Sequence, residues 1–149
     1  MRATSLFLAL FLCAGPALAC TAPPAQEMEI HLAALNAERA RAGRTGLVLD
    51  TSLSALAQAH ACDMSQRGYF SHTTPEGRTM MDRASRAGLR GYCAMGENIA
   101  QGQPDVPSVV ASWMRSPGHR RNMLGRGFSH VGFGRGPGAY WVQLFAGPC

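Results

Sequence analysis

The chain has 149 residues, of which 46% are hydrophobic and 15% are charged, and its formal net charge at pH 7 is +5. This composition excludes an intrinsically disordered chain, and the length suits one compact domain with a buried core. All fourteen basic residues are arginines spread along the chain, and no nucleic-acid-binding motif occurs, so we expect no nucleic-acid partner.

Residues 1–19 have the features of a secretory signal peptide. A positively charged start precedes a short apolar run, and Ala17-Leu18-Ala19 supplies the small-x-small pattern of a cleavage site. No other stretch is apolar over the roughly 18 residues that a spanning helix needs. We therefore expect one domain at residues 20–149, secreted or periplasmic. Lipid anchoring at Cys20 is a lesser alternative, because the residues before it match a lipoprotein signal poorly.

Cysteine usage also indicates export. Cys13 belongs to the signal, which leaves Cys20, Cys62, Cys93 and Cys149. Four cysteines in an oxidising compartment predict two disulfides with three possible connectivities. We favour Cys62–Cys93 together with Cys20–Cys149, because a bridge between the ends closes the longest loop, with a stabilisation on the order of 4 kcal/mol. The sequence contains no C-x-x-C pair, so we do not expect a structural zinc cluster.

The first part of the exported chain predicts two helices. Residues 27–41 carry apolar side chains at i, i+4 and i+7, and a glycine follows them. Residues 46–49 predict a short extended segment. The second helix begins after a cap at Asp50 or Ser52, and Gly68 ends it.

Three shorter helices are predicted farther along the chain, at residues 79–87, 105–115 and 117–123. The last two carry a proline in the first turn, where the missing N–H costs little.

The end of the chain changes to strand periodicity. Residues 128–135 and 139–145 predict a hairpin, and residues 97–101 predict a third strand. Both faces of the last strand carry bulky side chains, so we place this strand in the centre of its sheet: Tyr140, Val142 and Leu144 share one face, and Trp141, Gln143 and Phe145 share the other. The expected fold is α/β, a three-layer α–β–α sandwich with a small, mainly antiparallel sheet.

Several short segments follow one another in a recognisable order: Phe70-Ser71-His72, Gly96-Glu97-Asn98-Ile99-Ala100, residues 113–124 (WMRSPGHRRNML), Val131-Gly132-Phe133-Gly134 and Tyr140-Trp141-Val142-Gln143-Leu144-Phe145. They resemble the successive signatures of the CAP superfamily (cysteine-rich secretory proteins, antigen 5 and pathogenesis-related proteins). The resemblance is to the short bacterial form, the SCP domain, and runs from about residue 35 to residue 145.

The resemblance implies a shallow cleft with two histidines and acidic partners, which in many members binds a divalent cation. The matching residues are His72, His119 and Glu97. A second glutamate of the family pattern is replaced by Ser116, which weakens any metal site. Gln143 shares a strand face with Trp141 and is expected to line the cleft from beneath.

The chemistry of this set agrees with the resemblance. Two neutral imidazoles and a carboxylate are ordinary ligands of Zn²⁺, with a fourth position open to water. We therefore expect His72, His119 and Glu97 to be able to hold a divalent cation, with Zn²⁺ favoured. Glu97 has a second interpretation, in which it bonds backbone amides and orients a histidine.

The other histidines are predicted to be structural. His60 lies on the apolar face of the second helix and is expected to be a hydrogen-bonded core residue, and His130 lies in a strand. His31 is expected on the exposed side of the first helix.

No catalytic machinery is evident. There is no H-E-x-x-H helix, residues 127–131 fail the G-x-S-x-G pattern, and Ser71 adjoins His72 in a geometry unsuited to a nucleophile and its base. The preferred function is a secreted, monomeric binding module whose ligand is a lipid, a cell-wall fragment or a protein. The alternatives are a metal-dependent hydrolase acting on envelope material and an envelope-stabilising protein with a vestigial site.

Overall fold

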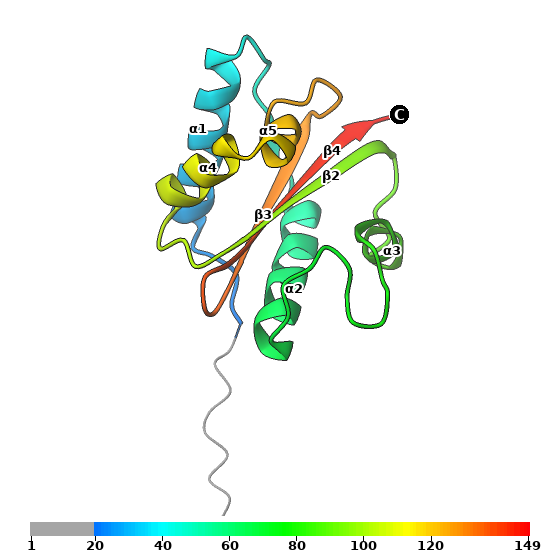
Figure 1. Ribbon diagram of the computed structural model, residues 1–149. Coiled ribbons are helices and arrows are strands. Elements are labelled where there is room, and N and C mark those ends of the chain that lie inside the picture. The colour runs from blue at the N-terminus through cyan, green and yellow to red at the C-terminus, as the bar shows by residue number, and fades with distance from the viewer. Residues whose placement is uncertain (1–19) are drawn as a thin grey trace, which may run out of the picture.

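The computed structural model describes residues 20–149, so the predicted signal peptide lies outside the described residues. Helices on both faces of one sheet form the expected three-layer α/β fold (Figure 1). Along the chain the elements are α1 (Ala25–Arg41), β1 (Val48–Leu49), α2 (Thr51–Arg67), α3 (Met80–Arg86), β2 (Tyr92–Gln101), α4 (Val106–Arg115), α5 (Pro117–Met123), β3 (His130–Gly136) and β4 (Tyr140–Pro148). Within residues 20–149 no helix is long and apolar enough to cross a membrane.

The predicted helix boundaries are confirmed to within two residues, and side-chain caps begin α2, α3 and α4. The Asp50 carboxylate accepts a hydrogen bond from the Leu53 amide at 2.8 Å and so begins α2. Gly68 ends α2 in the left-handed conformation, with φ of 67°. Thr79 and Asp82 form a reciprocal capping box at the start of α3.

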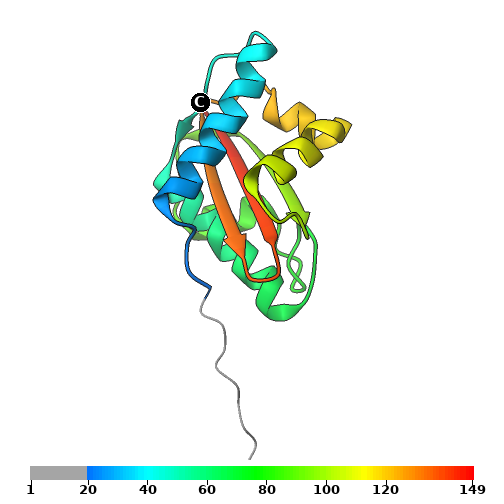
Figure 2. The ribbon, with the colours of Figure 1, turned by 90° about the vertical axis from the view of Figure 1, so that its left-hand side faces the viewer.

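The sheet has the strand order β1-β3-β4-β2 (Figure 2). β4 is central, as the bulk on both of its faces predicted, and it pairs antiparallel with β2 and β3. β1 pairs parallel with β3, so the sheet is mixed rather than purely antiparallel. β2 begins five residues earlier than predicted, because its first half pairs with the last residues of β4, a long-range contact that no local pattern reveals.

The two faces of the sheet pack in different ways. On the α2 face, Gly132, Gly134 and Gly136 let the helix backbone approach β3 closely, and an added Cβ at Gly134 would lie 2.4 Å from the carbonyl carbon of Ala57. On the opposite face, large side chains fill the space between the sheet and α1, α4 and α5; the largest hydrophobic ones are Trp113, Phe133, Trp141 and Phe145.

The expectation that His31 is exposed is wrong. The residue is 2% exposed, and its ring stacks on Phe133 at a centroid distance of 3.8 Å. The helix turns its His31–Leu35–Arg39 stripe fully into the core, while Met28 and Leu32 are half-buried. The aromatic face of the sheet offers the imidazole a flat stacking partner, which outweighs its polarity.

The favoured disulfide pairing is also wrong. Cys20 bonds to Cys62, and Cys93 bonds to Cys149, in place of Cys62–Cys93 and Cys20–Cys149. The sheet register explains the second bridge, because Tyr92 pairs with Pro148 and so brings the cysteines that follow them together. The first bridge ties the segment before α1 to α2. While that bridge is formed, the Cys20 sulfur is not available to carry a lipid.

Candidate functional site

The candidate site lies at an edge of the sheet. β2 is an edge strand, and its neighbours Glu97 and Asn98 point to opposite faces. The segment between α2 and α3 brings His72 to the Glu97 side, and α5 brings His119 to the Asn98 side. The candidate site therefore combines residues from both helical layers at the edge of the sheet, and it does not lie on a single face.

The Glu97 carboxylate is buried, with 3% of its side chain exposed, and both of its oxygens have partners. Oε1 accepts a hydrogen bond from Nδ1 of His72 at 2.8 Å. Oε2 pairs with the Arg83 guanidinium from α3. These partners compensate the cost of burying the charge. The geometry is therefore that of a carboxylate that orients a histidine.

His72 is exposed over 54% of its side chain, although its ring is anchored. Since Nδ1 donates to Glu97, the neutral ring carries its lone pair on Nε2. Arg83 Nη1 also donates to the His72 carbonyl at 2.8 Å. One arginine thus holds both the histidine backbone and the carboxylate that orients its ring.

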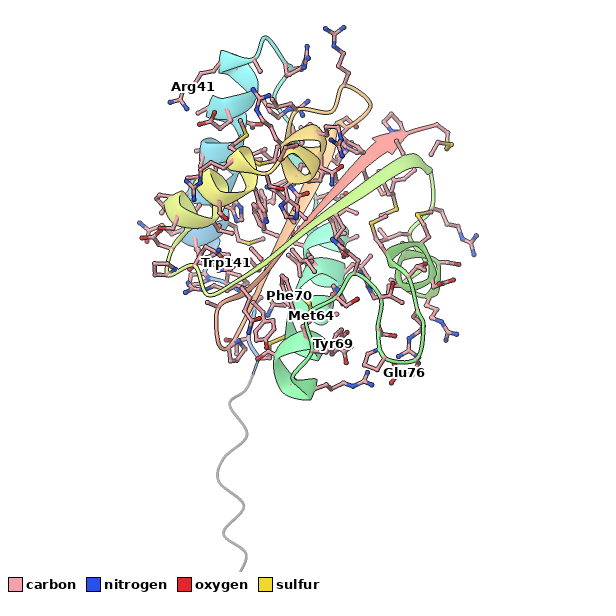
Figure 3. All side chains as sticks on the ribbon, in the orientation of Figure 1. Arg41, Met64, Tyr69, Phe70, Glu76 and Trp141 are labelled. Atoms are coloured by element: carbon pink, nitrogen blue, oxygen red, sulfur yellow. A yellow bond between two sulfur atoms is a disulfide. The ribbon has the colours of Figure 1, made fainter. Side chains whose placement is uncertain are left out.

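Charged contacts fasten the segment that carries His72 to the end of α2; Figure 3 labels Tyr69 and Glu76 on this segment. Arg67 pairs with Asp63 at 3.3 Å and also with Glu76, and the Tyr69 hydroxyl donates to Asp63. The position of His72 is consequently set by the fold before any ligand binds.

His60 is a hydrogen-bonded core residue, as predicted, but it also belongs to the site. It is 1% exposed, and its Nε2 lies 3.0 Å from the Ser71 carbonyl and 4.0 Å from Glu97 Oε1. Burial lowers the pKa of His60, and the nearby Glu97 charge opposes that shift. A neutral His60 therefore donates to Ser71 and braces the residue next to His72.

His119 lies half-buried on α5. Its pKa is lowered, first by burial and second by the charge of His72. The neutral form of His119, which is the form able to bind a ligand through a lone pair, is favoured at pH 7.

A buried amide network fixes α5 against β2. Asn98 Nδ2 donates to the His119 carbonyl at 3.2 Å and lies 3.0 Å from Gln143 Oε1, and Asn122 Nδ2 donates to Asn98 Oδ1 at 2.9 Å. Gln143 has no exposed surface, so it supports Asn98 instead of offering its amide to a ligand. Sequence reasoning missed Arg83 and the role of Asn98, because their partners are distant in the chain.

The donor set for a metal is small. Within residues 20–149 no group of three or more His, Cys, Asp or Glu side chains is arranged to hold an ion. Ser116, which replaces the second family glutamate, begins α5 without a side-chain capping bond. The arrangement thus offers two imidazoles, one of which is held by a carboxylate.

Comparison with known proteins agrees with the fold. Residues 32–145 match the family model described as the cysteine-rich secretory protein family, CAP. Among curated proteins, the Bacillus subtilis proteins YkwD, uncharacterised, and YlbC, an uncharacterised membrane protein, are 41% identical over 113 residues and 33% identical over 99 residues. These matches cover 75% and 66% of this chain but 44% and 28% of the relatives, which are longer proteins.

Solved structures give the same result. An extracellular protein from Bacillus anthracis that contains an SCP domain has a TM-score of 0.77 at 31% identity, over 82% of this chain and 40% of that one. An outer surface protein of Borrelia burgdorferi has the same TM-score of 0.77 at 22% identity, over 84% and 95% of the two chains, and shows likeness of fold alone. The chain belongs to the cysteine-rich secretory protein (CAP) family.

Proposed function

We propose that this protein is an exported binding module whose ligand occupies the cleft between His72 and His119. The ligand class is a lipid, a cell-wall fragment or a protein of the cell envelope, and a divalent cation, with Zn²⁺ favoured, shares the site. Two disulfides are typical of an oxidising compartment outside the cytosol. The extracellular location of the SCP-domain relative from Bacillus anthracis supports the same setting.

The observation that carries this proposal is the hydrogen bond between Glu97 and Nδ1 of His72. Metal-binding histidines commonly donate their second ring nitrogen to a carboxylate, which fixes the tautomer and the ring orientation. The unused Nε2 of His72 is the corresponding ligand atom. Two exposed or half-buried imidazoles with fixed backbones are a site prepared for a ligand.

The donor set fits a weakly held ion. His72 and His119 would hold it, and Glu97 would position His72 instead of coordinating, because both carboxylate oxygens already have partners. This assignment replaces the three-ligand set that the sequence favoured. With only two protein ligands, water or the organic ligand completes the coordination, and the affinity is below that of a closed structural zinc site.

Binding of the ion depends on pH. Protons and metal compete for the same imidazole nitrogens, so affinity falls as a ligand histidine becomes protonated. The lowered pKa of His119 keeps that ring neutral below its ordinary titration range, which is near 6.5. We therefore expect Zn²⁺ to bind at pH 7.5 and to be released on acidification below about pH 6.

Titration calorimetry with Zn²⁺ at pH 7.5 and pH 5.5 tests the proposal. The His72→Ala/His119→Ala variant should lose binding at pH 7.5, and Glu97→Gln should weaken it about tenfold to a hundredfold. His130→Ala is the matched control, because His130 bonds to Ser129 away from the cleft. Binding that survives the double substitution, or no binding at millimolar Zn²⁺, would contradict metal binding at this cleft.

One observation favours a metal-dependent hydrolase as the second candidate. A carboxylate that orients an exposed histidine is also the arrangement of a general base. The neighbouring Ser71 hydroxyl instead accepts a hydrogen bond from the Thr73 amide at 3.1 Å, which turns it toward its own backbone. Hydrolysis of envelope-derived peptides and esters that requires Zn²⁺ and His72 would favour this candidate over a binding module.

A further inference from the structure

A hollow of ≈470 Å³ lies where α4 meets α5, near the C-terminal end of α1. Four arginines line it, namely Arg44, Arg115, Arg120 and Arg121, with Met114 and Leu124 contributing apolar surface. Its volume falls in the range of small-molecule sites, about 300–1,000 Å³. Figure 3 labels Arg41 where α1 ends, and Figure 1 shows α5 beside that end.

The positive charge of this hollow is not neutralised within the described residues. None of its four arginines forms an ion pair with a carboxylate of residues 20–149, and no Asp or Glu of that range lines the hollow. The chain carries no acidic residue after Asp105, whereas five arginines follow it. Like charges gathered in one place repel one another, so a bound anion would stabilise this part of the fold.

A buried arginine, Arg39, supports the chain segments that form the hollow. Arg39 is 1% exposed, and its Nη1 donates to the carbonyls of Met123 at 2.7 Å and Gly125 at 3.0 Å. Its Nε donates to the Thr45 carbonyl at 2.8 Å. These bonds fasten the loop after α1 to the end of α5, and all three acceptors are neutral carbonyl groups.

Arg44 strengthens the same junction. Its Nε donates to the Leu124 carbonyl at 3.1 Å, which leaves the outer part of its guanidinium at the hollow. Burial and the neighbouring Arg44 charge both lower the pKa of Arg39. An anion in the hollow would reduce the mutual repulsion of Arg44 and Arg39 and would supply the missing counter-charge.

We infer that this hollow is a binding site for a phosphate-bearing anion with at least two negative charges, separate from the His72–His119 cleft. The guanidinium fork matches the oxygens of a phosphate group and binds them through paired hydrogen bonds. The positive charge of four arginines exceeds the single negative charge that one carboxylate carries. A diphosphate, or the phosphate of an anionic headgroup with a neighbouring charge, meets that requirement.

Calorimetric titration with inorganic pyrophosphate at low ionic strength tests the site. Binding should weaken at least tenfold in Arg120→Gln/Arg121→Gln, because this variant removes two of the four positive charges that line the hollow. Both residues are exposed, so the substitutions should leave the fold intact. The matched control is Arg86→Gln/Arg90→Gln, which removes the same charge from exposed residues at and after the end of α3. The control should change the dissociation constant less than twofold.

Vesicle sedimentation then separates the two sources of the phosphate. Phosphatidylglycerol vesicles, compared with phosphatidylcholine vesicles, report a lipid headgroup; pyrophosphate alone reports a soluble ligand. Binding to either probe that the Arg120/Arg121 substitutions abolish and the control retains supports the site. No binding to either probe, or equal loss in the two double variants, would overturn it. Neither result depends on Zn²⁺, so the test is independent of the proposed cleft function.

Discussion

The two faces of the sheet meet their helices by opposite means. On one face, glycines of β3 allow the backbone of α2 to approach until no room for a methyl group remains. On the other, aromatic rings fill the space between the sheet and α1, α4 and α5. One face is therefore sensitive to added atoms and the other to removed atoms, because protein interiors are close-packed.

The candidate site belongs to neither packing scheme. It lies at the β2 edge, where His72 comes from one layer and His119 from the other, and most of its bonds are polar. Substitutions should therefore lower stability most on the glycine face, less on the aromatic face and at its buried histidine, and least at the β2 edge.

The largest effect is expected on the glycine face. In Gly134→Ala the new Cβ would lie 2.4 Å from the Ala57 carbonyl carbon and the Gln58 amide nitrogen, so the backbone of α2 must move. We expect a loss of more than about 4 kcal/mol, or no cooperative unfolding, in thermal and urea denaturation. Gly127→Ala is the control, since its added Cβ meets only Ala94 Cβ at 3.9 Å. Equal stability of the two variants would refute close packing of α2 on β3.

On the aromatic face, Trp113→Ala should cost about 3–5 kcal/mol in urea denaturation. Trp113 is 1% exposed, and truncation leaves a cavity and also removes the hydrogen bond from its Nε1 to the Ile99 carbonyl at 3.1 Å. Trp113→Phe keeps most of the volume and should cost about 1–2 kcal/mol. A well-tolerated alanine would mean that α4 is not part of the core.

The buried histidine of the aromatic face should make stability depend on pH. Burial lowers the pKa of His31 to about 3, below the unfolded value of 6.5. Protonation therefore favours the unfolded chain: the stability contribution is complete above pH 6.5 and is lost as pH falls toward 3.

At pH 5 the contribution of His31 to stability is smaller by about 2 kcal/mol, since each pKa unit corresponds to about 1.36 kcal/mol. His31→Leu should remove most of the loss of stability between pH 7.5 and pH 5, whatever its effect at pH 7.5. Urea denaturation at the two pH values measures the difference. The remaining pH dependence then includes His60 on the other face and His119 on α5, whose pKa values are also lowered by burial. An unchanged pH dependence in His31→Leu would show that His31 is not buried in a neutral form.

The smallest effect on stability is expected at the edge. His72→Ala leaves the pair of Glu97 with Arg83 in place and removes a side chain that is more than half exposed, so the melting temperature should change by less than about 2 °C. His119→Ala should behave similarly in the same thermal scan. A large loss of stability in either variant would place that histidine in the core rather than in the cleft.

Local signals in the sequence determined the helices, because their ends are set by neighbours. The Asp50 cap, the Thr79–Asp82 box and Gly68 all act within one turn of chain. The position of β4 in the centre of the sheet was also readable, since period-two alternation with bulk on both faces requires cover on both sides. The residues of the cleft came from motif resemblance and not from spacing.

Only the tertiary structure decided which distant groups meet. It paired Cys93 with Cys149 through the strand register, and it buried His31 against Phe133. It also paired Arg83 with Glu97, and it gathered four arginines around one hollow. Disulfide connectivity, the partner of a buried charge and a shared cavity depend on contacts between segments far apart in the chain. Composition and periodicity describe each segment separately, so they cannot specify those contacts.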